Sequence, residues 1–249
     1  MIKNKKIIIV IPAYNAEKTL AGTYSEIPKN IVDKIILVDD GSRDDTYKVA
    51  KRLKIHVLKH NKNKGYGAAL KTGFSEALKM GTNTTIIVLH SDNQYPPKLI
   101  KDIVLPIVDK DYDLVLASRF LGKNPLKEGM PAFRYFSNKF LTFIQNITLG
   151  CGLTEYHTGY RAYNSRILQY IPYEINSDDF VFDNELLTQI SYFKYKITEI
   201  SCPAVYSSET SSINFTGSVK FGIKVLITCL KFMMHKYKIK KSILYYKKQ

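Results

Sequence analysis

Two adjacent carboxylates, Asp39 and Asp40, are followed at once by Gly41 and Ser42. Ionised carboxylates only accept hydrogen bonds, so this pair suits the hydroxyls of a ribose or the N–H edge of a base. The alternative is a turn that leads into a helix N-cap. A cap accounts for the polar residues at 44–46, but it leaves the two acids before the turn unexplained. Taken alone, the segment fits both interpretations.

Two further segments hold candidate ligand contacts. In the stretch Ile11-Pro-Ala-Tyr-Asn, Pro12 and Asn15 would end a strand, and the flat ring of Tyr14 would then be free to stack on a base. The segment 63–70 contains Gly65 and Gly67, a spacing that fits a loop opening a helix. By itself this glycine spacing more often marks only a helix start.

The elements that must position these residues alternate between β-branched runs and stretches of helical periodicity. This alternation predicts an α/β fold with a mostly parallel sheet, in which ligands bind at the carboxyl ends of the strands. The expected strands are Ile7–Ile11, Lys34–Asp39, Ile55–Lys59, Thr85–Leu89 and Asp113–Ser118. The expected helices are Glu17–Glu26, Thr46–Leu53, Gly67–Met80 and Pro97–Val108.

The pattern changes after Arg119, where a loop rich in Gly, Pro and charge precedes a predicted helix over Phe133–Leu149. We expect the second half to add a lobe to the sheet. Its further predicted elements are strands at Thr158–Asn164 and Ile197–Tyr206, an acidic helix at Asp183–Ser191 and a last helix at Val219–Tyr237. No repeat or low-complexity linker divides the chain, which favours one compact unit.

Composition restricts the class of protein further. The 249 residues are 45% hydrophobic, which excludes disorder. The net charge is +15, and the stretch 210–249 holds nine lysines and no acid. Three widely separated cysteines match neither a zinc site nor a disulfide framework, so we expect a reducing cytoplasm. The longest late apolar run, Val225–Met234, is interrupted by Lys231 and is too short to cross a bilayer.

Taken together, the motifs resemble family-two inverting glycosyltransferases of GT-A fold. The resemblance rests first on Ile11-Pro-Ala-Tyr-Asn and Val38-Asp-Asp-Gly-Ser, and then on Asn63-Lys-Gly-Tyr-Gly-Ala-Ala-Leu. It continues through Glu155-Tyr-His-Thr-Gly-Tyr-Arg, which is similar to a block of the dolichyl- and polyprenyl-phosphate mannose or glucose synthases. The resemblance implies a nucleotide-sugar site, whose implied residues are Pro12, Tyr14, Asp39, Asp40, Gly65, Ser91, Arg119 and Arg161.

The resemblance also implies a divalent metal. The segment Leu89-His-Ser-Asp-Asn-Gln-Tyr-Pro-Pro falls where the family carries an Asp-x-Asp motif. It assigns Asp92 and Gln94 to a Mg²⁺ or Mn²⁺ that neutralises the leaving diphosphate. Here His90 replaces the first acid of the motif. His90 is a third ligand, which would favour Mn²⁺, a hydrogen-bond donor to the metal's ligands, or a polar residue with no part in the metal site.

On the acceptor side, the resemblance makes Glu155 and Glu185 the candidate catalytic carboxylates beside Asp92. It also implies that Arg119 and Arg161 bind phosphate groups. The implied reaction moves a sugar from a UDP- or GDP-sugar to a polyprenyl phosphate with inversion. The family's synthases carry a phosphate-binding Arg later in the chain, and here Glu209 takes its place. The acceptor could therefore instead be the hydroxyl of a glycan, as in cell-envelope glycan synthesis. A non-catalytic nucleotide-sugar-binding partner is the remaining alternative.

The cationic end of the chain is the last feature. We expect residues 1–215 to form the GT-A domain, and residues 216–249 to form a basic amphipathic tail packed on or beside it. Aromatic and aliphatic residues among lysines are typical of a helix on an anionic membrane, which would make the protein peripheral at the inner face of the cell membrane. A solvated basic tail is the alternative. No nucleic-acid-binding module accompanies the charge, so nucleic acid is not an expected partner.

Overall fold

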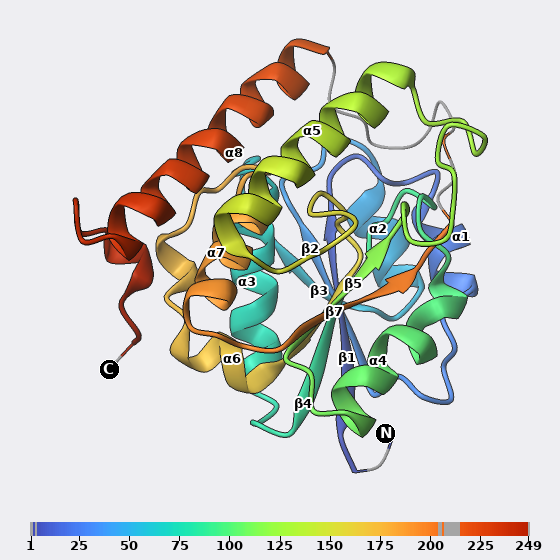
Figure 1. Ribbon diagram of the computed structural model, residues 1–249. Helices are drawn as coiled ribbons and strands as arrows, with labels where there is room; N and C mark the ends of the chain where they lie inside the picture. The colour runs from blue at the N-terminus through green and yellow to red at the C-terminus, as the bar shows by residue number, and fades with distance from the viewer. Residues whose placement is uncertain (1, 3, 204–205, 207–214, 249) are drawn as a thin grey trace.

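The computed structural model describes residues 2, 4–203, 206 and 215–248, and a seven-stranded sheet forms its centre (Figure 1). The strand order is β3-β2-β1-β4-β6-β5-β7, and every pairing is parallel except the two made by β6. The strands are β1 (Lys6–Ala13), β2 (Lys34–Asp39), β3 (His56–Lys59), β4 (Thr84–Val88), β5 (Leu114–Ser118), β6 (Arg161–Asn164) and β7 (Ile197–Ser201). The predicted α/β class with a mostly parallel sheet is confirmed.

Helices cover both faces of the sheet, because β1 and its neighbours are apolar on both sides. Ile8 and Val10 of β1 point into one core, and Ile7, Ile9 and Ile11 point into the other. The helices are α1 (Leu20–Ser25), α2 (Thr46–Arg52), α3 (Tyr66–Leu78), α4 (Ile100–Asp109), α5 (Ala132–Leu149), α6 (Ser165–Tyr170), α7 (Phe182–Tyr192) and α8 (Phe215–Lys236). Short 3₁₀ turns are η1 (Pro97–Leu99), η2 (Tyr173–Ile175) and η3 (Ile243–Tyr245).

Helix α1 begins at Leu20 instead of Glu17, α8 begins at Phe215 instead of Val219, and three further predicted elements differ from the structure. The strand expected at Thr158–Asn164 begins at Arg161 and runs antiparallel to both neighbours, and the one expected at Ile197–Tyr206 ends at Ser201. The helix expected from Pro97 starts as the turn η1, and the regular helix α4 begins at Ile100. The short helix α6 was not predicted.

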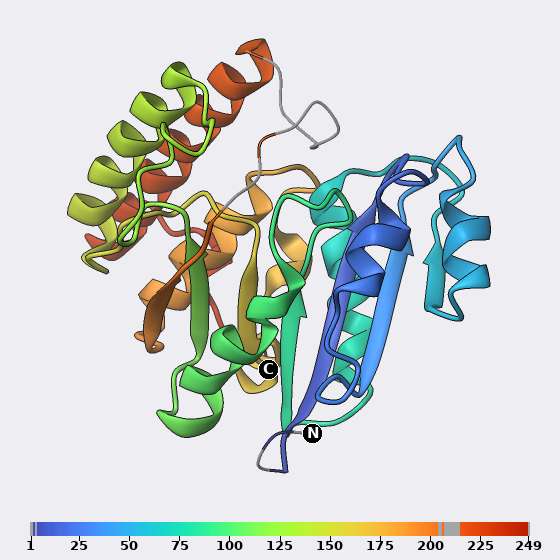
Figure 2. The same ribbon diagram turned by 90° about the vertical axis from the view of Figure 1, so that its right-hand side faces the viewer.

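Helices α5 and α8 lie side by side at one end of the molecule, away from α2 at the other end (Figures 1 and 2). Leu141 of α5 and Val225 and Cys229 of α8 form a small buried cluster with Val181. The two helices run in the same direction, since Leu141 lies opposite Gly222 and Thr148 lies beside Cys229.

The chain beyond α8 returns to the body of the molecule. Ser242 N donates to Nδ1 of His235, whose Nε2 lies 3.1 Å from the hydroxyl of Tyr192. Leu244 and Tyr245 are buried, and Lys248 N donates to the carbonyl of Tyr170. In the described part of the chain, no helix combines the length and the hydropathy that crossing a membrane requires.

Candidate active site

A cleft of about 420 Å³ opens at the carboxyl ends of β1 and β4, where the strand order reverses direction. In open α/β sheets this is the position at which ligands bind. The cleft brings together seven of the predicted site residues, namely Pro12, Tyr14, Asp40, Gly65, His90, Ser91 and Asp92. The ring of Tyr14 is 45% exposed, so one of its faces is open to a ligand.

The two adjacent acids play different structural parts. Asp40 accepts hydrogen bonds from the backbone N–H groups of Lys64 and Gly65, at 2.9 and 2.8 Å, and its Oδ1 lies 2.6 Å from Nδ1 of His60. Asp40 therefore shapes the loop before α3 as well as lining the cleft. Asp39 is fully buried and accepts from Ser42 N, while its Oδ2 has no hydrogen-bond partner among the described residues.

The glycines before and within α3 let another loop approach closely. Gly65 has a φ of 106°, and a Cβ there would lie 2.4 Å from the carbonyl oxygen of Asp178. A Cβ on Gly67 would lie 2.3 Å from the carbonyl oxygen of Ser177. Real Cβ atoms do not come this close, so only glycine fits at either position.

Glu185 holds this same loop instead of facing a cavity. Its carboxylate accepts from Ser177 N at 2.6 Å and from Ser177 Oγ at 3.0 Å. Burial raises the pKa of Glu185, and the hydrogen bonds from Ser177 oppose that shift. The side chain lines neither the cleft nor the pocket described next, so its geometry is that of a positioning residue.

The three residues assigned to a metal are not gathered in one cavity. Asp92 lines the cleft, Gln94 lines the second pocket and His90 lines both. Asn93 between them has a left-handed φ of 58°, and Gln94 N donates to Oδ1 of Asp92. Within the described residues, no group of three or more His, Cys, Asp or Glu side chains is arranged to hold a metal ion.

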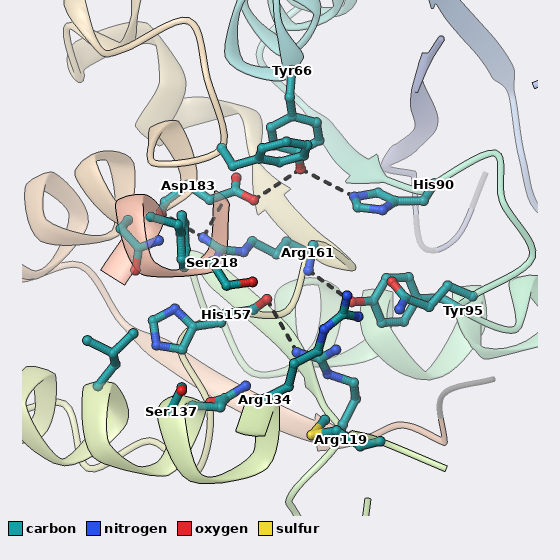
Figure 3. Close-up of a pocket in the computed structure, with 18 of the residues that line it drawn as sticks. Tyr66, His90, Tyr95, Arg119, Arg134, Ser137, His157, Arg161, Asp183 and Ser218 are labelled. Carbon is teal, nitrogen blue, oxygen red and sulfur yellow. Dashed lines mark hydrogen bonds and ion pairs between the residues drawn. The ribbon is translucent and has the colours of Figure 1, made fainter. Parts of the chain in front are cut away.

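A second pocket, of about 190 Å³, lies beside the cleft and is lined by polar and apolar side chains (Figure 3). Arginines from three elements reach it, and its apolar side includes residues of both α5 and α8. The lining residues that matter below are Arg119, Arg134, Arg161, His157, Asp183, Met130, Phe133, Leu141 and Phe221.

Tyr66, His90 and Phe180 line both cavities and so form the wall between them. The ring of Tyr66 stacks on Phe180 with centroids 5.2 Å apart. Its hydroxyl donates to Oδ2 of Asp183 at 3.0 Å and lies 3.4 Å from Nε2 of His90, as Figure 3 shows. The wall is therefore a polar bridge between the segment after β4 and the start of α7.

Asp183 is the carboxylate that faces the second pocket, and the sequence-based choice of Glu185 missed it. Burial raises its pKa, although Arg161, Tyr66 and His90 act against that shift. Its Oδ1 lies 3.9 Å from Nη1 of Arg161 and has no hydrogen-bond partner among the described residues. Residues 183 and 185 are two positions apart, which places them on different faces of α7. The aromatic residues at 180 and 182 do not indicate which of the two acids faces the pocket.

Glu155 is buried beneath the pocket and binds Arg119. Its carboxylate accepts from Arg119 N at 2.8 Å, from Arg119 Nε at 2.9 Å, from Arg119 Nη2 and from Asn138 Nδ2 at 2.9 Å. Burial by itself would raise the pKa of Glu155, but the charge and hydrogen bonds of Arg119 lower it overall. The side chain of Glu155 lines neither cavity, so its geometry is that of a residue that orients Arg119.

Arg161 reaches the pocket but uses much of its guanidinium internally. It donates to the backbone carbonyls of Thr158, Asp183 and Tyr156 at 2.8 to 2.9 Å. These bonds tie the segment before β6 to the start of α7. Arg161 therefore contributes charge to the pocket, whereas Arg119 and Arg134 approach it from β5 and α5.

His157 is a neutral polar group in the pocket wall. Burial lowers its pKa to about 3, so the imidazole carries no charge near neutral pH. Both ring nitrogens are buried and have no hydrogen-bond partner among the described residues, and the ring meets Phe221 of α8 edge-on. Neither His157 nor Arg134 was a predicted site residue: His157 lies between the chosen Glu155 and Arg161, and Arg134 lies on α5, outside every motif.

Comparison with known proteins places the chain in a family. The family model described as glycosyl transferase family 2 matches residues 8–171. The chain is 30% identical over 251 residues to a UDP-N-acetylglucosamine–dolichyl-phosphate N-acetylglucosaminyltransferase of Methanococcus voltae, a match that covers 94% of this chain and 98% of the relative. It is 25% identical over 204 residues to a polyprenol monophosphomannose synthase of Mycolicibacterium smegmatis, covering 79% and 76% of the two chains.

Among solved structures, the fold is similar to glucosyl-3-phosphoglycerate synthase from Mycobacterium tuberculosis, in a complex with Mn²⁺, UDP and glucosyl-3-phosphoglycerate. The TM-score is 0.71 and the sequences are 19% identical, with 96% of this chain and 82% of that chain covered. This likeness confirms the predicted GT-A fold.

Proposed function

The chain is an enzyme of glycosyl transferase family 2, and we propose that it moves a sugar from a nucleotide diphosphate donor to a polyprenyl phosphate with inversion. The observation that carries the proposal is the pairing of two adjoining cavities, one at the strand ends and one lined by arginines and apolar side chains. We further propose that the enzyme acts at the inner face of the cell membrane, where both substrates would meet.

The second pocket suits a phosphate attached to an apolar chain. Arg119, Arg134 and Arg161 supply positive charge, and guanidinium groups fit phosphate oxygens with two parallel hydrogen bonds. Met130, Phe133 and other apolar residues of the lining would contact the first prenyl units. The similarity to a dolichyl-phosphate transferase and a polyprenol monophosphomannose synthase supports this acceptor class.

On the donor side, the cleft would hold the nucleoside and the diphosphate. The exposed ring of Tyr14 would stack on the base, and the carboxylates of Asp39 and Asp40 would lie near the ribose. Pro12, Gly65 and Ser91 complete the predicted set at the strand ends. Asp39 is fully buried and does not line the cleft, so its carboxylate would contact the ribose only after a shift of the surrounding chain.

A divalent Mg²⁺ or Mn²⁺ fits the cleft when the donor supplies part of its coordination. Such ions are commonly bound by one or two protein groups together with substrate phosphates, and Asp92 and His90 line the same cleft. We propose Asp92 as the main ligand, with His90 and Gln94 as further candidates. When bound, the ion would neutralise charge on the departing diphosphate.

The residues around the wall would set the reaction geometry. The acceptor attacks from the pocket side while the nucleotide leaves on the cleft side, so the two substrates meet at Tyr66, His90 and Phe180. A phosphate acceptor is already ionised at neutral pH and needs no strong base. Asp183 would then orient Tyr66 and Arg161 without accepting a proton from the acceptor.

A sugar hydroxyl as acceptor is the second candidate, and Asp183 is the observation that favours it. Its carboxylate faces the pocket, and burial raises its pKa, which makes the carboxylate a stronger base. Glu209, which kept this alternative open in the sequence, lies outside the described residues.

The test is a transfer assay with the full chain. UDP- and GDP-sugars are supplied with Mn²⁺ or Mg²⁺, with or without a short polyprenyl phosphate, and released nucleotide is measured. We expect release that needs both the lipid phosphate and the metal, and that stops when EDTA is added. Release that is equal with and without the lipid would overturn the acceptor assignment.

Asp183→Asn separates the two candidate acceptors. The amide keeps the hydrogen bond from Tyr66 but cannot take a proton, so transfer to a lipid phosphate should fall by less than about tenfold. Transfer to a hydroxyl should fall by about a hundredfold or more, the usual contribution of a general base. Asp178→Asn is the matched control, because Asp178 is an exposed carboxylate on the neighbouring loop.

A further inference from the structure

Helix α5 carries a stripe of exposed apolar side chains. Phe133, Phe136, Phe140, Phe143 and Ile147 recur every three or four residues, and their exposure ranges from 38% to 68%. At about 100° per residue, this spacing places them on one face of the helix. The opposite face, which includes Leu141 and Gln145, is buried against the body of the molecule.

Helix α8 carries a matching stripe. Its exposed apolar residues are Val219, Ile223, Leu226, Ile227, Leu230, Met233 and Tyr237, the last just after the helix end. Val225 and Cys229 pack on α5 and α7, and Ile223, Leu226 and Leu230 lie roughly a third of a turn further round. Because the two helices run side by side in the same direction, the stripes join into one surface, which we call the α5–α8 face (Figures 1 and 2).

The charge of the α5–α8 face is of one sign. Neither helix contains an Asp or a Glu, and their cations are Arg134, Lys139, Lys220, Lys224, Lys231 and Lys236. Lys139, Lys220 and Lys231 are exposed and lie at the outer borders of the apolar stripes. Apolar residues bordered by lysines are the composition of helices that lie in the interface of an anionic membrane.

From these observations we infer that the α5–α8 face lies on the surface of an anionic bilayer, with the aromatic side chains of α5 inserted between the lipids. A second copy of the chain fits this face less well, since pairing two such faces would set like charges against each other. The tail alone was predicted to contact a membrane. The structure adds α5, a helix about eighty residues earlier in the chain.

The face also adjoins the second pocket. Phe133 and Arg134 of α5, and Ser218 and Phe221 of α8, line that pocket. Docking would therefore bring the pocket arginines to the level of the lipid headgroups, where the phosphate of a polyprenyl chain resides. This orientation rests on the proposed function, whereas the docking itself rests only on the surface.

The chain has no tryptophan, so a single substitution gives a clean reporter. The full-length Phe140→Trp protein is mixed with vesicles of phosphatidylcholine and phosphatidylglycerol at 3:1, or of phosphatidylcholine alone. We expect a blue shift of the emission with the anionic vesicles, reversed by high salt. Tyr170→Trp is the control, because Tyr170 is 52% exposed on α6, outside the face; an equal shift there would contradict the proposal.

Co-sedimentation of full-length variants with the same vesicles supplies the second measurement. Phe136→Ser combined with Phe140→Ser should weaken binding on the order of tenfold or more, by removing two inserted side chains. Tyr170→Ser combined with Ile175→Ser removes two similarly exposed apolar residues elsewhere and should leave binding unchanged. Circular dichroism checks that each variant is folded.

Two results would overturn the inference. One is full vesicle binding by the folded Phe136→Ser/Phe140→Ser protein. The other is a dimer in sedimentation velocity that the same double substitution dissociates, which would show that a second copy covers the face. Failure of the proposed acceptor is distinguishable, because the transfer assay with a short polyprenyl phosphate needs no vesicles. A protein that docks but ignores the lipid phosphate would refute only the proposed function.

Discussion

A methyl group at residue 65 would collide with the backbone of residue 178. Gly65 has a positive φ, and a Cβ there would lie only 2.4 Å from the carbonyl oxygen of Asp178, on the loop that Glu185 holds. We predict that Gly65→Ala destabilises the protein by about 2 to 4 kcal/mol, from backbone strain and the enforced shift of that loop. Urea denaturation measures the loss.

Gly81→Ala is the matched control for this prediction. Gly81 has a φ of 105°, but a Cβ there would meet nothing within 4 Å. Its substitution should cost only the strain of the left-handed backbone, about 1 kcal/mol. An equal loss of unfolding free energy at residues 65 and 81 would show that the close approach of the 177–178 loop does not affect stability.

Individual site residues differ in how far the sequence could reveal them. Asp40, Gly65 and Asp92 lie within short motifs, so their joint position in the cleft could be expected. His157 lies within the motif 155–161 but was not chosen from it, and Asp183 reaches the pocket through tertiary packing that no local spacing encodes. The choice between Asp183 and Glu185 depends on the rotation of α7 about its axis, and that rotation is set by the whole core.

At the level of elements, one buried carboxylate joins the second half of the sheet to α5. Glu155 binds Arg119 at the end of β5 and Asn138 of α5, and its own N–H donates to Glu199 of β7. We predict that Glu155→Gln costs about 3 to 5 kcal/mol at pH 7, because it leaves the buried Arg119 without its counter-charge. Chemical denaturation at several pH values tests this.

The pKa shift of Glu155 fixes how the destabilisation caused by Glu155→Gln changes with pH. Arg119 lowers the pKa of Glu155 in the folded protein, so the stabilisation is complete above the unfolded pKa of about 4.3 and is lost as the pH falls through the folded value. The difference between wild type and Glu155→Gln should therefore shrink from pH 5 to pH 3. Asp45→Asn breaks the exposed pair with Lys48 and should cost under about 1 kcal/mol. A difference of constant size across this range would contradict this role of Glu155.

The order of the elements and the parallel direction of most strands were predictable from the sequence. The strands β1 to β5 appear within one or two residues of their expected positions, because each is a compact apolar run between polar turns. The antiparallel direction of β6 could not be deduced, because the sequence pattern of a strand does not differ between parallel and antiparallel pairing. Strand β7 is shorter than expected. The apolar residues after Ser201 suggested a longer strand, but the pairing with β5 ends at Ser201.

At the scale of the whole molecule, the end of the chain is part of the core. Leu244 is buried against α7 and its carbonyl accepts from Gln189, while the adjacent Ile243 is 71% exposed. We predict that Leu244→Ala lowers the free energy of unfolding by about 2 to 4 kcal/mol, through loss of burial and the cavity left behind. Ile243→Ala should change it by less than about 0.5 kcal/mol.

Thermal or urea unfolding of the two variants distinguishes a packed end from a loose basic tail. If both substitutions proved equally mild, the segment after α8 would be detached in solution. The sequence indicated the amphipathic helix and the overall fold from their periodicity. It did not indicate the return of residues 242–248 onto Tyr170 and Tyr192, because so short a segment carries no periodic signal.

Because β6 is antiparallel, the cleft and the second pocket are lined by segments that meet the sheet in opposite directions. Because β6 runs against β4, with Arg161 opposite Val88, the residues that precede it reach the same edge of the sheet as the residues that follow β4. Segments that leave the parallel strands β1 and β4 line the cleft, whereas His157 and Gly159, on the segment that enters the antiparallel strand β6, line the pocket together with residues of α5. If the proposed function holds, acceptor selectivity would change through residues 150–160 and α5 while the loops of the cleft stay constant, and the fold would carry two specificities that evolve independently.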